Sequence, residues 1–115
     1  MSTDNIQYPA LLQHPDDDEL DVVSCSEDWV QKCRSQAFVA GLYPGVRLID
    51  SQGRVYPLTL SCARVQLQDG TEQLSLDQVL QLVRLHASLQ GSCCVAKIGA
   101  RSIADAILLV VHLSD

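Results

Sequence analysis

The chain has 115 residues, of which 47% are hydrophobic and 4% aromatic, and its formal net charge is −6. A chain of this length buries roughly two-thirds of its surface on folding, so this composition supports one aliphatic core and excludes disorder for the body of the chain. The eight Lys and Arg residues are scattered singly, which argues against nucleic acid and anionic membranes as partners, because both require clustered positive charge.

The first two predicted elements are strands over residues 8–13 and 20–24. Proline and acidic residues between them supply turn geometry, so the two strands are predicted to form a hairpin. Ser24 and Glu27 have the spacing of a capping box and predict a helix that runs to about residue 40, where Gly41 ends it. The predicted apolar face of this helix consists of Trp29, Val30, Cys33, Ala37 and Ala40.

Two further hairpins are predicted from paired strands around short turns. Residues 46–50 and 54–60 flank the turn sequence DSQG, and residues 64–68 and 72–74 bracket Asp-Gly. Pro57 has no N–H for a sheet ladder, so its strand is predicted to lie at a sheet edge or to be broken there.

The clearest helix covers residues 76–90, with Ser75 and Gln78 as a capping box at its start and Gly91 after its end. At 100° per residue, His86 lies in the middle of its apolar face. We interpret His86 as a histidine at the edge of the core that is hydrogen-bonded to a nearby carbonyl. A catalytic base or a metal ligand is the alternative interpretation.

Residues 93–98 are predicted to form a short strand, which places Cys93 and Lys97 on one face and Cys94 on the other. Free cysteine packs as a small hydrophobe, and this is the interpretation that we favour for both cysteines. The alternative is a reactive Cys93, with Lys97 stabilising its thiolate and His86 acting as its base or as a metal co-ligand.

The last predicted element begins at Ser102, where the spacing to Asp105 indicates a helix to about residue 113. The run ILLVVHL is also compatible with a strand. Taken together, the elements predict an α+β fold, a mainly antiparallel sheet with two or three helices packed on it. We expect one domain over residues 1–115, with residues 1–6 flexible.

The first 28 residues carry eight acidic side chains and no basic ones. We interpret this acidic segment as a solvated surface, with a docking surface for a basic partner as the alternative. Its run Asp16–Asp21 does not fit an EF-hand loop, because Asp21 occupies the position that requires glycine.

No cofactor or metal site is predicted. Cys25, Cys33 and Cys62 are isolated in the sequence, and the adjacent pair Cys93 and Cys94 cannot chelate one ion from opposite faces of a strand, whereas structural zinc requires four ligands. Phosphate-binding loops and common catalytic motifs do not occur in the sequence, which argues against an enzyme.

The compartment follows from targeting signals and cysteine usage. The first ten residues carry no basic residue and no apolar run, unlike a secretory signal, and the longest apolar run, residues 107–111, is too short to span a bilayer. An odd number of cysteines, five, indicates free thiols. We therefore expect a cytoplasmic protein without membrane contact.

Several short motifs together carry a resemblance to a known family. They are DDEL at residues 17–20 with Trp29 nine residues later, LIDSQGRVY at residues 48–56, the pair His86-Ala87, and GSCCVAKI at residues 91–98. On these motifs the chain resembles a family of short gammaproteobacterial proteins known only as a domain of unknown function. The resemblance covers nearly the whole chain and implies a bacterial cytoplasmic protein. It implies no activity and no functional residue.

Three functional hypotheses remain. The first is a small non-catalytic protein that acts through a protein partner or by self-association, because its apolar content leaves residues for an interface. The second is a thiol-dependent activity or transient metal binding, centred on Cys93, Cys94 and His86 with support from Lys97. The third is a small-ligand pocket between the sheet and the helices.

Overall fold

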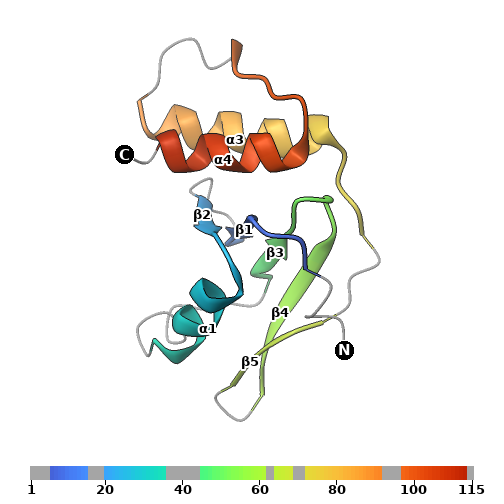
Figure 1. Cartoon of the computed structure of the whole chain (residues 1–115), viewed down its shortest axis with the longest axis vertical. Coiled ribbons are helices and arrows are strands. Elements are labelled where there is room, and N and C mark those ends of the chain that lie inside the picture. Colours follow the sequence, from blue (N-terminus) through green and yellow to red (C-terminus); the bar gives the residue numbers. More distant parts are fainter. Residues whose placement is uncertain are drawn as a thin grey trace.

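A computed structural model of the chain describes residues 6–15, 20–35, 45–61, 64–68, 72–91 and 97–113. Within these ranges the chain forms five strands and three helices (Figure 1). In chain order these are β1 (Ala10–Gln13), β2 (Leu20–Val23), α1 (Ser26–Arg34), β3 (Arg47–Ile49), β4 (Val55–Ser61), β5 (Arg64–Leu67), α3 (Leu76–Leu89) and α4 (Ile103–Leu113).

The strands form one sheet in the order β2-β1-β3-β4-β5, and each of these pairings is antiparallel. The predicted hairpins of β1 with β2 and of β3 with β4 are confirmed, with Leu11 opposite Val22 and Leu48 opposite Tyr56. The α+β class with a mainly antiparallel sheet is therefore confirmed.

Residues that alternate along the strands divide the core between the two faces of the sheet. Leu11, Ile49 and Val55 stand in register on the face beneath α3 and α4, in the first core cluster. Leu12 and Leu48 stand on the opposite face, in a second cluster against which Trp29 of α1 packs. Both faces are thus covered, which explains why the central strands carry long runs of apolar residues.

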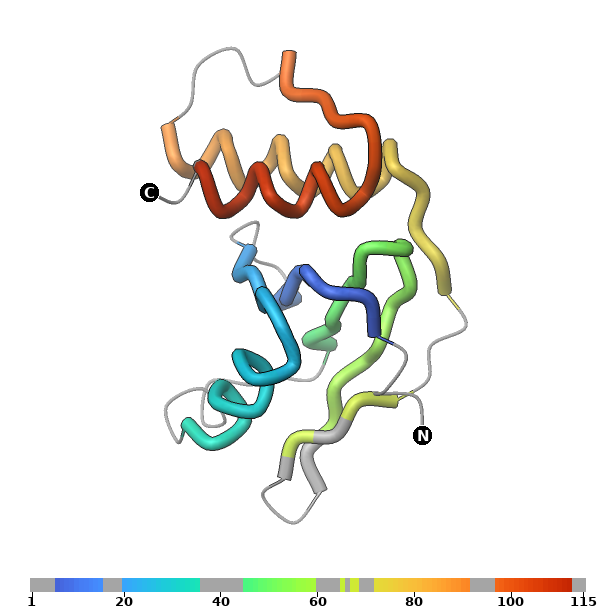
Figure 2. The backbone as a smooth tube through the Cα atoms, viewed as in Figure 1, coloured from blue at the N-terminus to red at the C-terminus, as the bar shows by residue number. Residues whose placement is uncertain are grey.

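Helices α3 and α4 contact each other along one side of the sheet and run in the same direction (Figure 2). The predicted capping box of α3 is confirmed, because the Ser75 hydroxyl accepts from the Gln78 N–H and the Gln78 side chain accepts from the Ser75 N–H. The segment 103–113 is a helix rather than a strand, with the Ser102 hydroxyl accepting from the Asp105 N–H at 3.2 Å. None of the helices described is long and apolar enough to cross a membrane.

Three expectations for α1 are wrong. The helix ends at Arg34, with Ser35 as an extended C-cap, rather than at about residue 40. The N-cap is Cys25 rather than Ser24, and the Ser24 N–H instead donates to the Asp28 carboxylate at 3.0 Å. Val30 is 45% exposed although it was assigned to the apolar face. The helix rests on the sheet through Trp29, and a step of 100° along the helix turns the next side chain away from that contact. Ala37 and Ala40 lie outside the described ranges.

Pro57 does not mark a sheet edge, because β4 lies between β3 and β5. Its position is tolerated for a local reason. The Leu58 N–H donates to the Val46 carbonyl, so by the alternation of an antiparallel ladder the Pro57 nitrogen points toward β5. β5 ends at Leu67, opposite Leu58, and the missing N–H therefore falls at the end of the β4–β5 ladder.

The predicted hairpin between residues 64–68 and 72–74 is also wrong. β5 pairs with β4, while Gln73 forms an isolated bridge with Arg54 and the Leu74 N–H donates to the Gly53 carbonyl at 2.8 Å. Leu74 is buried in the first core cluster. Burying this side chain draws the segment along the β3–β4 turn instead of back along β5.

Two further expectations concern the ends of the chain and the segment before α4. Lys97 and Ile98 do not form a strand, and the Arg84 guanidinium donates to the Ile98 carbonyl at 2.9 and 3.2 Å. Residues 92–96, which complete the predicted strand, lie outside the described ranges. Ile6, assigned to the flexible end, is buried in the second cluster.

The β3–β4 turn depends on glycine at position 53, where φ is +83° and an added Cβ would overlap the Leu74 carbonyl oxygen. We expect Gly53→Ala to lower the free energy of unfolding by about 3 kcal/mol, measured by urea denaturation. Gly91→Ala is the matched control, because φ there is +77° but the built Cβ meets no described atom within 4 Å. It is expected to cost about 1 kcal/mol. Equal losses in the two variants would contradict the overlap at Gly53.

Candidate functional site

His86 lies in the core, with 1% of its surface exposed. Its Nδ1 accepts a hydrogen bond from the backbone N–H of Leu20 at 3.0 Å, across 66 residues of sequence. An accepting Nδ1 carries no proton, so the neutral ring holds its proton on Nε2. The expected inward direction of His86 is confirmed, and the donor to its Nδ1 is a backbone amide N–H.

The bond from His86 reaches the edge of the sheet. β2 is the outermost strand beside β1, and the alternation of the ladder points the backbone groups of Leu20 away from β1. Exposed strand edges are open to pairing with other chains, and proteins commonly cover them with helices. His86 thus connects α3 to the start of an edge strand, which is a structural task.

Asp50 is a buried group that the sequence did not single out. It is fully buried at the β3–β4 turn, where its carboxylate accepts from the backbone N–H groups of Gln52 at 2.9 Å, Arg54 at 3.0 Å and Gln7 at 3.3 Å. The Tyr56 hydroxyl lies 3.5 Å away. Burial first, and then the negative charge of Asp50, raise the pKa of the Tyr56 phenol.

This carboxylate organises the turn and attaches the N-terminal segment to it. The Gln7 N–H donates to Asp50, the Ser51 N–H donates to the Gln7 carbonyl, and the Ser51 hydroxyl donates to the Pro9 carbonyl. The motif LIDSQGRVY therefore has a structural explanation. The signal that could have identified Asp50 is an aspartate at the first position of a turn that ends in glycine.

The predicted thiol constellation lies partly outside the described ranges and stays a prediction. His86 is buried, Lys97 is exposed, and Cys93 and Cys94 lie outside the described ranges. Cys25 is exposed and Cys33 is half-buried, and both are free thiols. Burial raises the pKa of the Cys33 thiol, which disfavours the reactive thiolate.

Alkylation of the native protein across pH provides a direct test. Since the pKa of Cys33 is raised, less of it is thiolate at neutral pH, and we expect it to react several-fold more slowly than Cys25, with a rate that still increases above pH 9. Peptide mass spectrometry gives the rate for each cysteine. Rapid modification of Cys33 at pH 7 would contradict this assignment, and rapid modification of Cys93 would support the thiol hypothesis.

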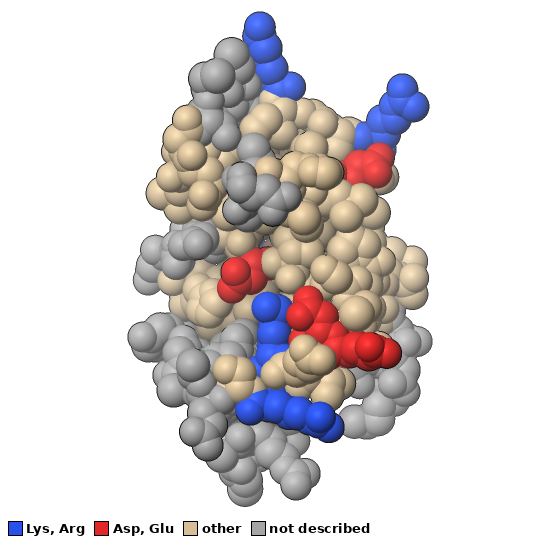
Figure 3. Space-filling view, turned by 60° about the vertical axis from the view of Figure 1, so that its left-hand side comes forward, with Lys and Arg blue, Asp and Glu red and all other residues tan. Residues whose placement is uncertain are grey.

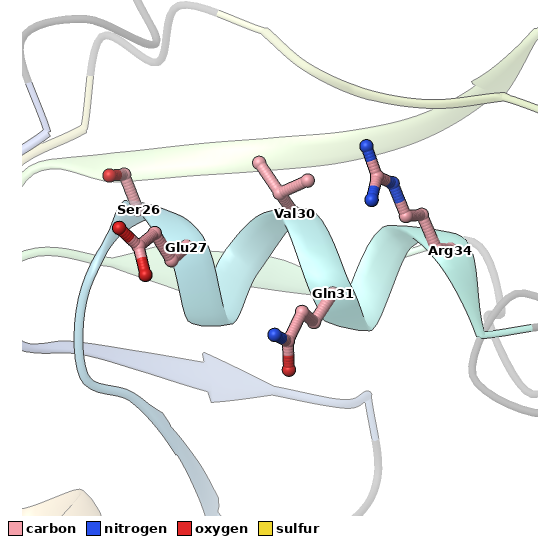
Figure 4. A pocket seen from close by; sticks show the side chains of 5 residues that line it. All are labelled: Ser26, Glu27, Val30, Gln31 and Arg34. Carbon is pink, nitrogen blue, oxygen red and sulfur yellow. The ribbon is translucent and has the colours of Figure 1, made fainter.

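A hollow of about 250 Å³ lies along the outer side of α1 (Figure 4). Its described lining comes from this one helix: Ser26, Glu27, Val30, Gln31 and Arg34. The lining contains one carboxylate and one guanidinium but no pair of nucleophile and base. In the part of the chain that the structure describes, no three His, Cys, Asp or Glu side chains are grouped as metal ligands would be.

The remaining unusual surface is apolar and belongs to α3 and α4. Leu89 is 56% exposed and Leu108 is 45% exposed, and Leu85 and Val111 are also exposed. Figure 3 shows that uncharged atoms make up most of the described surface at the level of these helices, although basic side chains and an acidic one project at that end, and further charged side chains gather near the middle of the molecule. These aliphatic side chains can pack against apolar groups of a partner, but they carry no reactive group.

Comparison with known proteins agrees with the resemblance stated from the motifs. The sequence profile of DUF4144, described as a protein structure with unknown function, matches residues 8–110. Among solved structures, the NMR structure of a protein from Shewanella amazonensis is similar, with a TM-score of 0.69 and 27% sequence identity over 94% of this chain and 90% of that chain. The search of curated proteins gives no match.

Proposed function

Because the chain belongs to the DUF4144 family, whose function is unknown, we propose its role from its own surfaces: a non-catalytic cytoplasmic protein that acts by binding a protein partner or further copies of itself. One observation carries this proposal. The two helices over the sheet turn four aliphatic side chains toward solvent: Leu85, Leu89, Leu108 and Val111.

Burial of these side chains in a contact is the physical driving force. Complete burial of a leucine is favourable by about 1.5–3 kcal/mol, and two of the four leave about half of their surface in water. The net charge of the segment that contains these helices is too small to repel a partner. Residues 75–113 carry three basic residues and two acidic ones, whereas residues 1–28 carry eight acidic residues and no basic one.

The buried polar groups support a role without catalysis. His86 is engaged by the Leu20 N–H and Asp50 by three backbone N–H groups, so both already serve the fold. Catalytic groups must reach a substrate, and these two are shielded from solvent. The free thiols of Cys25 and Cys33 support a reducing compartment, the cytoplasm.

The test uses the full chain as bait in bacterial lysate, together with light scattering for self-association. Leu89→Asp combined with Leu108→Asp is expected to abolish retention of the bound proteins or the self-association, because both charges would have to be buried in the contact. Gln31→Asp, an exposed change on α1 away from these helices, is the control and is expected to bind as the wild type does. A wild-type protein that neither self-associates nor retains any protein lost by the double variant would contradict the proposal.

A further inference from the structure

We propose that α4 is the contact surface between two copies of this chain, which pack their α4 helices antiparallel about a two-fold axis beside Leu108. This inference rests on the proposed function and names a second copy as the partner. It is carried by the pattern of exposed side chains on one helix.

The apolar part of this surface is a stripe along α4. Ala104, Leu108 and Val111 fall within about 60° of one another on the helix. Leu108 is 45% exposed, Val111 is 37% exposed and Ala104 is half-buried. The opposite part of the helix packs into the first core cluster, where Ala106, Ile107 and Val110 are buried. The i, i+4, i+7 spacing of the stripe is the spacing by which one helix packs against another.

Two charged or polar side chains beside the stripe indicate which partner it binds. Asp105 and His112, both exposed, lie within about 20° of each other on the same flank, seven residues apart. When two α4 helices pack antiparallel, the same flanks meet. An axis midway between these residues then places Asp105 of each copy opposite His112 of the other. Both reciprocal pairs join an acceptor carboxylate to an imidazole donor.

The same axis also settles the apolar contacts. Leu108 meets Leu108 of the second copy near the axis, and Ala104 lies within about 3 Å of Val111 of the second copy along the helix direction, so that a small side chain packs beside a larger one. Parallel packing about a two-fold axis would instead bring opposite flanks together and leave Asp105 of each copy away from His112 of the other. A surface that is complementary to itself fits the two-fold symmetry of most homodimers. A foreign partner would have no reason to require this reciprocity.

The contact is small. One helix pair covers less than the roughly 800 Å² per partner of a standard interface, so we expect a weak dimer whose dissociation is seen in the micromolar range or above. Sedimentation of the full chain over a series from low micromolar to near-millimolar concentration measures the dissociation constant.

Leu108→Asp is expected to raise the dissociation constant by about tenfold or more. Val30→Asp, which changes an aliphatic residue of α1 that is 45% exposed like Leu108 but lies outside the stripe, is the matched control and is expected to leave it unchanged. Asp105→Ala and His112→Ala are each expected to weaken the dimer several-fold. Exchanging the two residues, Asp105→His with His112→Asp, restores both reciprocal pairs and is expected to return the dissociation constant to near the wild-type value.

Circular dichroism of each variant checks folding, and Val111→Gln replaces Leu108→Asp if the latter does not fold. A wild-type chain that stays monomeric throughout the series overturns the second-copy proposal, while a foreign protein retained in the bait experiment would still support the proposed function. A dimer that is equally weakened by Val30→Asp, or an exchange variant that is as weak as the single changes, overturns the antiparallel α4 contact.

Discussion

Replacing His86 with alanine is expected to lower the free energy of unfolding by about 4 kcal/mol. Two losses combine in this variant. The imidazole is 1% exposed, so its removal leaves a cavity between α3 and the sheet. The Leu20 N–H also loses its buried acceptor at 3.0 Å. Urea denaturation followed by circular dichroism measures the effect.

Three companion variants separate these losses. His86→Leu fills the cavity but supplies no acceptor, whereas His86→Asn supplies an acceptor oxygen near the position of Nδ1. We expect both to be more stable than His86→Ala. His112→Ala removes an exposed histidine from α4 and is expected to change stability by about 0.5 kcal/mol or less. A His86→Ala protein as stable as the wild type would mean that the ring does not support the edge strand. The alternative interpretation of His86 as a catalytic base would then be favoured.

Replacing Asp50 with alanine is expected to cost about 4 kcal/mol as well. The carboxylate is fully buried and accepts from three backbone N–H groups, which belong to Gln7, Gln52 and Arg54. Hydrogen bonds to a charged acceptor are the stronger ones, and their loss leaves three donors near the core without this partner. Thermal and urea denaturation measure the loss.

Asp50→Asn keeps one acceptor oxygen and is expected to fall between the wild type and Asp50→Ala. Asp21→Ala, on the exposed side of β2, is the control and is expected to have little effect. A second readout is independent of stability. Because the charge of Asp50 raises the pKa of the Tyr56 phenol, Asp50→Asn should lower that pKa while burial still keeps it above the ordinary value. An unchanged ultraviolet titration of Tyr56 would contradict the proximity of the two groups.

The elements that sequence patterns predicted correctly are those with local signals. The capping box at Ser75 and the glycine after α3 bound a helix that begins at the expected residue and ends one residue earlier than expected. The turn between β3 and β4 and the alternation of its strands likewise depend on neighbouring residues. Helical periodicity alone sufficed to direct His86 inward.

The errors occur where a distant residue decides. Pro57 is accepted inside the sheet because β5 ends beside it. The segment before α3 follows the β3–β4 turn because Leu74 enters the first core cluster. Asp50 was not recognised as a buried group because two of its four partners, Gln7 and Tyr56, lie outside the turn itself. The residues next to Asp50 in the sequence predict only that it belongs to a turn, and they do not predict that it is buried.

By itself, the sequence determined the α+β class, the hairpins of β1 with β2 and of β3 with β4, helix α3 and the inward direction of His86. These depend on periodicity and on capping between residues a few positions apart. Only the tertiary structure decided that Leu20 is the partner of His86, that Asp50 holds the N-terminal segment, and that Leu89 and Leu108 remain in water. Each of these depends on how whole elements pack, and packing sets burial and long-range hydrogen bonds that no short stretch of sequence contains.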